Sequence, residues 1–378
     1  MISERLQRTR PRVAIVSDPL VQRGGAERCV EAMAEAFPDA PVFALLYSAE
    51  TGPASLAARV VPTWLNRIPG AARRHRAFLP LFPAAIESID LSGYDVILSS
   101  HHTVAKGLLR RSGQVHVCYC HTPMRALWER PHEEIASVPA LARPAVQALF
   151  SRLRVWDAVT ALRVDRFVAN SRATQRRIEQ HYGRESTILN PPIDVERFTP
   201  GGEPGDYYLV ASRPVAYKRI DVAIAAARRL GRRVIVTGGT PRERVEGVEY
   251  RGVVSDAELL TLMRGARALL FPQVEDFGMT PLEVNACGRP VVAYGAGGAL
   301  ETVVDGVTGV LAADQDPDAF AGAIARSEAI AFDPRMLRAH AERFARPAFI
   351  ASLREIVHAE FASANAPLGD GIELATLR

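Results

Sequence analysis

The sequence predicts an α/β protein built from two doubly wound domains in tandem, and three observations support this fold class. The chain has 378 residues, more than one hydrophobic core usually supports. Short, nearly continuous apolar runs alternate with amphipathic segments in both halves, which is typical of parallel sheets joined by crossover helices. Between the halves lies the segment 189–205, LNPPIDVERFTPGGEPG, which is too rich in Pro and Gly to form a long element.

The first domain is predicted to span residues 1–196. It opens with the apolar run 13–17, followed by Gly24-Gly25 and an amphipathic segment over 26–37, so a strand, a turn and a helix are expected in this order. Each further apolar run ends where polar or glycine residues begin. The further strands expected in this half are 42–47, 96–100, 115–120 and 166–170.

The second domain is predicted to span residues 197–346, where the same alternation starts again. A last helix over about 347–363 is expected to pack back onto the first domain. The strands expected in this half are 207–212, 234–237, 250–253, 268–271 and 291–294.

The composition is that of a globular enzyme, with 48% hydrophobic and 23% charged residues. Four cysteines without framework spacing favour a reducing compartment. No window of about 18 uncharged apolar residues predicts a membrane span, and no apolar leader precedes a small-residue cleavage site. We therefore expect a cytoplasmic protein.

Two glutamates, Glu275 and Glu283, flank the run Asp276-Phe277-Gly278-Met279-Thr280-Pro281-Leu282, directly after a predicted strand. Open α/β sheets bind ligands at the carboxyl ends of their strands, which favours a ligand-binding role for Glu275. Glu283 has two interpretations. It either contacts a ligand or completes a capping box in which Thr280 is the N-cap residue and Pro281 begins the helix.

A cationic pair, Arg213 and Lys218, follows the first strand of the second domain. Both side chains are placed to converge on one anion at the carboxyl edge of the sheet, so a diphosphate site is the functional interpretation. The alternative is a solvated basic turn.

The first domain offers weaker signals. Gly24 and Gly25 suit a phosphate-facing turn but lack the third glycine of G-x-G-x-x-G. His121 ends a strand and is either a hydrogen-bonded core histidine or a group that faces a ligand. Cys118 and Cys120 are expected to be a buried pair of thiols, because no partner cluster with zinc spacing accompanies them.

Two further segments were weighed. Asp314-Gln315-Asp316 matches a D-x-D metal pattern, but it precedes Pro317 and a predicted helix, so a loop and N-cap role is favoured and no metal is assigned. Residues 64–79 interleave cationic, aromatic and aliphatic side chains, which suits an anionic membrane surface, a nucleic acid or an ordinary solvated segment equally well.

Taken together, these motifs resemble those of the retaining glycosyltransferases of the GT-B fold, family 4. Within this family, their residues are similar to those of bacterial O-antigen and exopolysaccharide mannosyltransferases. The resemblance runs from about residue 12 to about residue 312. It rests on Gly24-Gly25-Ala26-Glu27, His121-Thr122-Pro123, Val168-Ala169-Asn170-Ser171, Asn190-Pro191-Pro192, Arg213 with Lys218, the Glu275 to Glu283 motif, and Gly297-Gly298 with Glu301.

The resemblance implies a role for each matching residue. Arg213 and Lys218 would neutralise a donor diphosphate, Glu275 would hold a hydroxyl of the transferred sugar, and Glu283 would bind the ribose. His121 would contact the sugar. The backbone of Gly24, Gly25, Phe277, Gly278 and Met279 would face sugar and phosphate.

The resemblance also implies two Rossmann-like domains that face a central cleft and close over the donor. It implies transfer of a hexose with retention and without a metal or other cofactor, most specifically mannose from GDP-mannose, to a saccharide or lipid-linked oligosaccharide at the inner face of the cell membrane. A UDP-sugar is the alternative donor. Rival functions are a glycoside hydrolase, which also needs two carboxylates, and a non-catalytic sugar-nucleotide-binding module. No nucleic-acid partner is expected.

Overall fold

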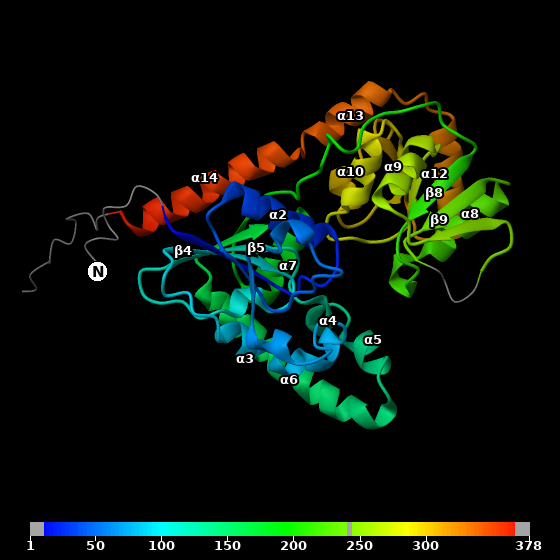
Figure 1. Cartoon of the computed structure of the whole chain (residues 1–378). Helices are drawn as coiled ribbons and strands as arrows, with labels where there is room; N and C mark the ends of the chain where they lie inside the picture. The colour runs from blue at the N-terminus through cyan, green and yellow to red at the C-terminus, as the bar shows by residue number, and fades with distance from the viewer. Residues whose placement is uncertain (1–10, 240–243, 367–378) are drawn as a thin grey trace, which may run out of the picture. The chain divides into compact units, whose positions relative to one another are not determined.

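The computed structural model describes residues 11–239 and 244–366, which form two parallel sheets with helices around them (Figure 1). This confirms the predicted fold class. Each sheet has the order of a doubly wound fold, in which the chain first adds strands in one direction and then returns to add them in the other.

The first sheet has seven strands in the order β3-β2-β1-β4-β5-β6-β7. Strand β1 pairs in parallel with β2 on one side and with β4 on the other, so the topological switch point lies between β1 and β4. The strands are β1 (Val13–Ser17), β2 (Val42–Ala44), β3 (Val60–Pro62), β4 (Val96–His101), β5 (Val115–Cys120), β6 (Arg166–Ala169) and β7 (Ser186–Ile188).

The second sheet has six strands in the order β10-β9-β8-β11-β12-β13, and all of its pairings are parallel. Its switch point lies between β8 and β11, where Leu209 is in register with Leu269. The strands are β8 (Tyr207–Ala211), β9 (Arg233–Thr237), β10 (Val248–Gly252), β11 (Leu269–Phe271), β12 (Val291–Tyr294) and β13 (Gly309–Ala312).

Helices connect successive strands, as crossover connections between parallel strands require. Those that follow strands of the first sheet are α2 (Gly25–Ala36), α3 (Phe82–Glu87), α4 (Arg125–Trp128), α5 (Pro131–Ala136), α6 (Arg143–Thr160) and α7 (Arg172–Tyr182). The helices that come after β8, the first strand of the second sheet, are α8 (Ile220–Arg229), α9 (Asp256–Gly265), α10 (Met279–Ala286), α11 (Ala299–Thr302), α12 (Pro317–Glu328), α13 (Pro334–Glu342) and α14 (Arg346–Ala364).

The apolar strands of the second sheet are buried on both faces. Val210, Val236 and Leu270 belong to one core cluster, together with apolar side chains of α8 and α12. Their neighbours along the strands, such as Leu209 and Leu269, belong to a second cluster with side chains of α9, α10 and α13. Successive residues of a strand point to opposite faces, so helix-covered faces on both sides explain why these strands are nearly continuous apolar runs.

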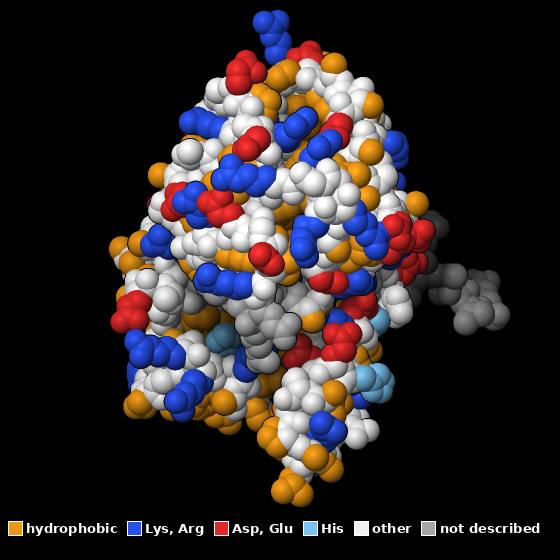
Figure 2. All heavy atoms as spheres, turned by 90° about the vertical axis from the view of Figure 1, so that its right-hand side faces the viewer, with side chains coloured by type: hydrophobic (Ala, Val, Ile, Leu, Met, Phe, Trp, Pro, Cys, Tyr) orange, Lys and Arg blue, Asp and Glu red, His pale blue; other side chains and the backbone are white. Residues whose placement is uncertain are grey.

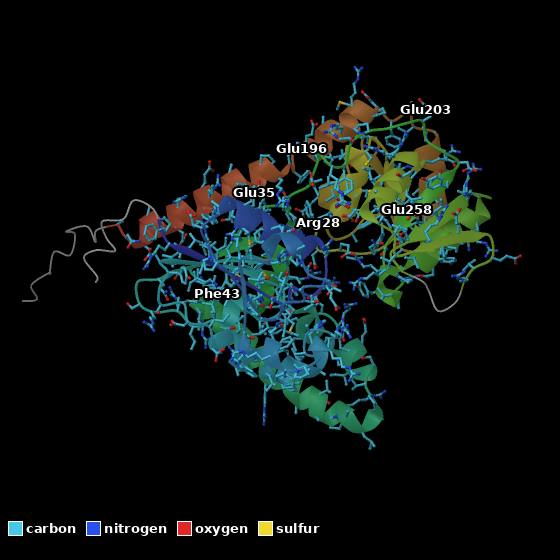
Figure 3. All side chains as sticks on the ribbon, viewed as in Figure 1. Arg28, Glu35, Phe43, Glu196, Glu203 and Glu258 are labelled. Carbon is cyan, nitrogen blue, oxygen red and sulfur yellow. The ribbon has the colours of Figure 1, made fainter. Side chains whose placement is uncertain are left out.

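In the first sheet, the middle residue of β2 packs its aromatic ring against a second ring. Phe43, which Figure 3 labels, lies edge-on to Tyr94 with ring centroids 5.9 Å apart. Both rings pack against a core cluster that includes Ala14, Val16 and Ile97 of β1 and β4.

The contacts divide the chain into two compact units, residues 1–168 with 351–378 and residues 169–350. This division differs from the linker position predicted near residue 197. By strand order β7 belongs to the first sheet, but α7 and the segment after it have more contacts with the rest of the second unit. Charged contacts that join α7 to residues of the second unit are described below.

Helix α14 contributes residues to both units, with the change between Ile350 and Ala351. In the first unit, Arg354 donates from Nε to the carbonyl of Ala36 at 2.7 Å and from Nη2 to the carbonyl of Glu35 at 3.3 Å. Figure 3 labels Glu35 on α2. The guanidinium therefore caps the carboxyl end of α2, where carbonyl groups lack partners within the helix.

None of the helices within the described residues combines the length and the apolar character that crossing a membrane requires.

A buried ion pair holds the first unit together around α6. Lys106 and Asp157 are both almost fully buried, and Lys106 Nζ lies 2.7 Å from Asp157 Oδ1. Lys106 also donates to Thr160 Oγ1 at 2.9 Å, and Trp128 Nε1 donates to Asp157 Oδ2 at 2.7 Å. The carboxylate therefore links the loop after β4, helix α4 and helix α6.

Removal of one member of this pair should destabilise the first unit strongly, because the other charge stays buried without compensation. We expect Lys106→Met to lower the free energy of unfolding by about 3–5 kcal/mol. The double variant Lys106→Met, Asp157→Asn should recover a large part of that loss. Denaturant unfolding of the intact chain measures both; a single variant as stable as the wild type would show that the pair is not needed.

Candidate active site

The candidate site lies at the switch point of the second sheet, at the carboxyl ends of β8 and β11. Arg213 and Lys218 follow β8, and Glu275 follows β11. These strands are neighbours in the sheet although about 60 residues separate them in the chain. The switch point is where loops on either side diverge and leave room for a ligand.

Lys218 and Glu275 form an ion pair between the ammonium Nζ and the carboxylate Oε1. The side chain of Lys218 is 14% exposed and that of Glu275 is 21% exposed, so the pair is largely withdrawn from water yet still reachable. The structure thus brings together two residues that the sequence assigned to one site. Since each charge already has a partner, an anionic ligand would share Lys218 with Glu275.

Helix α10 begins at Met279, and its N-cap residue is Gly278 with φ 85° and ψ 79°. A side chain at position 278 would be strained at this positive φ, and its Cβ would lie 3.1 Å from Cζ of Phe271. The capping box predicted with Thr280 as N-cap is therefore wrong, because the left-handed glycine starts the helix two residues earlier. No side chain caps this helix, so its first N–H groups remain for a ligand or solvent.

Glu283 lies inside α10 and is only 5% exposed. It is the fifth residue of the helix, so it does not hold the third position that the capping box assigned to it.

Gly297 and Gly298 lie very close to the backbone of the loop that carries Glu275, which requires a small residue at both positions. A Cβ on Gly297 would lie 2.5 Å from the carbonyl oxygen of Glu275, and one on Gly298 would lie 2.1 Å from that of Phe277. The N–H of Gly298 donates to the carbonyl of Glu275 at 2.9 Å. The two glycines therefore fix the backbone that carries the carboxylate and the start of α10.

Helix α7 is tied to this loop by two acidic side chains. Asp276, the neighbour of Glu275, forms an ion pair with Arg177 of α7. Glu301 Oε1 accepts the backbone N–H of Arg172 at 2.9 Å, at the start of the same helix. Burial raises the pKa of Glu301, while hydrogen bonds from the first N–H groups of α7 oppose the rise. Neither role was predicted, since pairing across about 100 residues leaves no local signal.

Three polar groups at this edge have no partner among the described residues. The Oγ of Ser212 and the Oε1 of Gln273 are buried without a hydrogen bond, and the exposed Arg213 has no acidic neighbour there. Ser212 follows β8 and Gln273 follows β11, so the strand register places them close together. Buried polar atoms usually have a partner, which makes this edge a place where a polar ligand would be satisfied.

The Gly24-Gly25 turn of the first unit already holds a carboxylate. Gly24 is the N-cap residue of α2, and Glu27 accepts hydrogen bonds from its own backbone N–H, from Gly24 and from Gln22. A Cβ on Gly24 would lie 2.9 Å from Glu27 Oε2. Burial raises the pKa of Glu27 despite these bonds. The glycine at position 24 is thus explained by Glu27, which sequence reasoning did not place in the site.

His121 is 8% exposed, at the end of β5 in the first unit. Its Nε2 is 2.9 Å from Ser100 Oγ, and its ring lies edge-on to Tyr119 and His102. Burial lowers the pKa of His121 from 6.5 to about 3, so the imidazole is neutral at physiological pH. A neutral ring serves as a hydrogen-bonding group rather than as a cation for phosphate.

Two expectations for other motifs are confirmed. Cys118 and Cys120 are free thiols and both are fully buried on β5. Asp316 is the N-cap residue of α12, and its Oδ1 accepts the N–H groups of Asp318 at 2.8 Å and Ala319 at 2.9 Å. The D-x-D pattern is therefore a helix cap, as the position before Pro317 indicated.

Comparison with known families accounts for most of the chain. The family described as "Glycosyltransferase Family 4" matches residues 23–197, and the family described as "Glycosyl transferases group 1" matches residues 206–327. The chain belongs to the family 4 glycosyltransferases of the GT-B fold. The glycoside hydrolase considered from the two carboxylates alone is thereby set aside.

Relatives in sequence carry the same kind of name. The chain is 32% identical over 200 residues to the D-inositol 3-phosphate glycosyltransferase of Geodermatophilus obscurus, covering 42% of this chain and 44% of that protein. It is 30% identical over 234 residues to the protein of the same name from Mycobacterium avium, covering 51% and 55%. The chain thus spans about half the length of these relatives.

Solved structures confirm the GT-B fold. Anabaena HepE in complex with UDP and glucose superposes with a TM-score of 0.66 at 18% identity, covering 92% of this chain and 99% of that one. Sucrose-phosphate synthase from Thermosynechococcus elongatus gives a TM-score of 0.68 at 18% identity, covering 94% and 100%.

The structure predicts a loss of stability in mild acid. Burial lowers the pKa of both His116 and His121 from 6.5 to about 3, so the unfolded chain binds protons that the folded chain does not. The free energy of unfolding should therefore fall as pH drops from about 6.5 toward about 3, by up to about 1.4 kcal/mol per pH unit for each histidine.

Denaturant unfolding between about pH 7 and about pH 5 measures this slope in a range where most carboxylates stay ionised. His121→Gln should reduce the slope by about one proton. A variant slope equal to that of the wild type would show that His121 does not contribute.

Proposed function

We propose that the protein transfers a hexose from a nucleotide sugar to a saccharide acceptor, with retention of anomeric configuration and without a metal ion. The observation that carries this proposal is the Lys218–Glu275 ion pair at the switch point of the second sheet, with Arg213 earlier in the loop that carries Lys218. A cation and a carboxylate that are paired and mostly buried, but still partly exposed, suit a ligand that carries both phosphate and hydroxyl groups.

The donor diphosphate would lie against Arg213 and Lys218, which neutralise the charge that develops as the bond from sugar to phosphate breaks. Glu275 would accept a hydroxyl of the sugar and Glu283 those of the ribose. The uncapped N–H groups at the start of α10 would face the same phosphate or sugar oxygens. Ser212 and Gln273 supply two more polar atoms that a ligand would satisfy.

In this scheme the acceptor hydroxyl attacks on the face from which the phosphate departs. The bond between the anomeric carbon and the phosphate oxygen breaks, the bond to the acceptor oxygen forms, and the departing phosphate oxygen takes the acceptor's proton. No side-chain base is then needed, and retention follows from attack on that face. His121, Gly24 and Gly25 would contact the donor from the first domain once the domains close.

Two nucleotide sugars are proposed as alternative donors. GDP-mannose follows from the resemblance to mannosyltransferases, whereas UDP-glucose is the donor bound in a solved structure of Anabaena HepE. The acceptor is proposed to be a saccharide or a lipid-linked oligosaccharide, and the names of the sequence relatives add a cyclitol phosphate as an acceptor to include.

A function limited to binding would not depend on the charges that act in the transition state. We expect Lys218→Ala and Glu275→Gln each to lower the rate of nucleoside diphosphate release from the best donor by about 10²–10³-fold. Arg228→Ala and Glu246→Gln, which change exposed residues of the same unit, are the matched controls.

The assay presents a panel of GDP- and UDP-sugars with a set of acceptors, with and without EDTA. Turnover that both substitutions leave unchanged would contradict the site assignment. Loss of turnover in EDTA, restored by a divalent ion, would contradict the metal-independent mechanism. Binding of a nucleotide sugar without turnover on any acceptor would favour the non-catalytic module.

A peripheral contact with an anionic membrane, on the cytoplasmic side of the cell, is proposed for residues 64–79. In this segment Leu65 and Ala71 are buried in the core, but Trp64 is 40% exposed. Exposed cationic side chains follow it at Arg67, Arg73, Arg74 and Arg76. Exposed aromatic and cationic groups on one segment suit a headgroup layer. On the face shown in Figure 2, cationic and acidic side chains of the described residues are interspersed, which does not favour a nucleic-acid partner.

Flotation with vesicles tests this contact. We expect the protein to float with vesicles that contain phosphatidylglycerol and not with phosphatidylcholine alone, and added salt should weaken the binding. The variant Arg73→Ala, Arg74→Ala, Arg76→Ala should lose the interaction, whereas Arg228→Ala should keep it. Equal recovery on neutral vesicles, or none on either kind, would contradict the electrostatic contact.

A further inference from the structure

Gln315 joins the two loops that carry Lys218 and Glu275. Its Nε2 donates to the carbonyl of Pro272 at 2.7 Å, and its Oε1 accepts from Arg219 Nη1 at 3.3 Å. Gln315 lies between β13 and α12, in the segment whose D-x-D pattern is explained by helix capping through Asp316. Capping leaves the central residue of the pattern without a role, and these contacts supply one.

The first loop is held in an uncommon conformation next to Lys218. Arg219 has φ 47° and ψ 37°, and among the described residues other than glycine it alone has a positive φ. Such a conformation is unfavourable for a residue with a side chain and persists where the surroundings enforce it. Here the guanidinium lies 3.4 Å from Asp221 Oδ1 and donates to Gln315. Arg219 ends the short 3₁₀ helix η7 (Ala216–Lys218), which carries Lys218, and it is the N-cap residue of α8.

The second loop is held at its first residue. Pro272 directly follows β11, and Glu275 is three residues further along the chain. A hydrogen bond to the Pro272 carbonyl fixes the direction in which the chain leaves the sheet. From Glu275 onward the backbone is fixed by Gly297 and Gly298.

We propose that Gln315 is a positioning residue for the donor site, which holds Arg219 and Pro272 so that Lys218 and Glu275 meet in the geometry that transfer requires. This inference rests on the proposed function. Gln315 itself contacts neither of the two charged groups in the described structure, so it acts through the loops. Its amide suits the task, because it donates on one side and accepts on the other.

The expected kinetic signature is a change in kcat with little change in KM for the donor. Lys218 keeps its charge when Gln315 is altered, so attraction of the diphosphate in the ground state is retained. Contacts that must be aligned in the transition state are lost, and small displacements of this kind cost about 10-fold to 100-fold in rate.

The variants separate the two bonds of the amide. Gln315→Met keeps the length of the side chain and removes both bonds, so it should lower kcat by about 10-fold or more. Gln315→Glu keeps the acceptor for Arg219 but cannot donate to Pro272 when ionised, and it should be intermediate. Arg219→Gly accepts the positive φ and removes the guanidinium, so it tests the side chain without backbone strain.

Two neighbours in the same segment serve as controls. Asp314→Asn changes an exposed residue that makes no hydrogen bond or ion pair with the described residues, and it should leave kcat unchanged. Asp316→Ala removes the cap of α12, which should lower the unfolding temperature without changing kcat well below that temperature. A role for Gln315 in stability alone would make Gln315→Met behave like Asp316→Ala.

A readout independent of activity is available because the chain has two lysines, Lys106 and Lys218. Protein labelled with 13C-lysine should show side-chain NMR signals from both, which Lys218→Arg assigns. In Gln315→Met we expect the Lys218 signal to move toward its position in Glu275→Gln, while the signal of the buried Lys106 stays in place.

An unchanged Lys218 signal together with an unchanged kcat in Gln315→Met would overturn the inference. A kcat that falls only in parallel with stability, with Lys218 unmoved, would overturn it as well. If the wild type releases no nucleoside diphosphate from any donor while Lys218 still responds to Gln315→Met, the proposed function fails and the positioning of Lys218 by Gln315 stands.

Discussion

The pairing of β8 with β11 is the constraint on which the candidate site depends. These two strands belong to opposite directions of chain winding, so the loops that follow them leave the sheet on either side of a gap. Lys218 comes from one loop and Glu275 from the other, and their opposite charges meet across that gap. Other contacts of the region, from Gly297 and Gly298 to Asp276 and Gln315, restrain one of these loops or join the two.

The sequence predicted ten of the thirteen strands of the described residues, and it missed β3, β7 and β13, each of which has only three or four residues. Strands covered on both faces are nearly continuous apolar runs, and this pattern survives in Val291–Tyr294 as in Val13–Ser17. A loop that follows such a strand is placed at the ligand-binding edge by topology alone. Arg213, Lys218 and Glu275 could be predicted as candidate site residues for that reason, and the structure pairs Lys218 with Glu275.

Features that depend on backbone conformation or on distant partners could not be predicted. The capping-box interpretation of T-P-L-E failed because α10 begins after Gly278, whose left-handed conformation leaves no signal in the sequence pattern. The pairing of Asp276 with Arg177 joins residues about 100 positions apart, and Gln315 reaches Pro272 over 43 positions. Glu27 belongs to a motif that the sequence analysis quoted. Its carboxylate accepts backbone N–H groups of the same turn, and this depends on a backbone conformation that the sequence pattern does not specify.

The close approach of Gly297 and Gly298 to residues 275–277 also bears on the entropy of ligand binding. A loop that becomes ordered only when its ligand arrives loses conformational freedom at that moment, and affinity falls accordingly. Here the carbonyl of Glu275 is already bonded to Gly298, and α10 already begins at its left-handed glycine. The ordering of this loop is completed during folding. Small size at positions 297 and 298 is therefore a condition for a loop that is preformed at the candidate site.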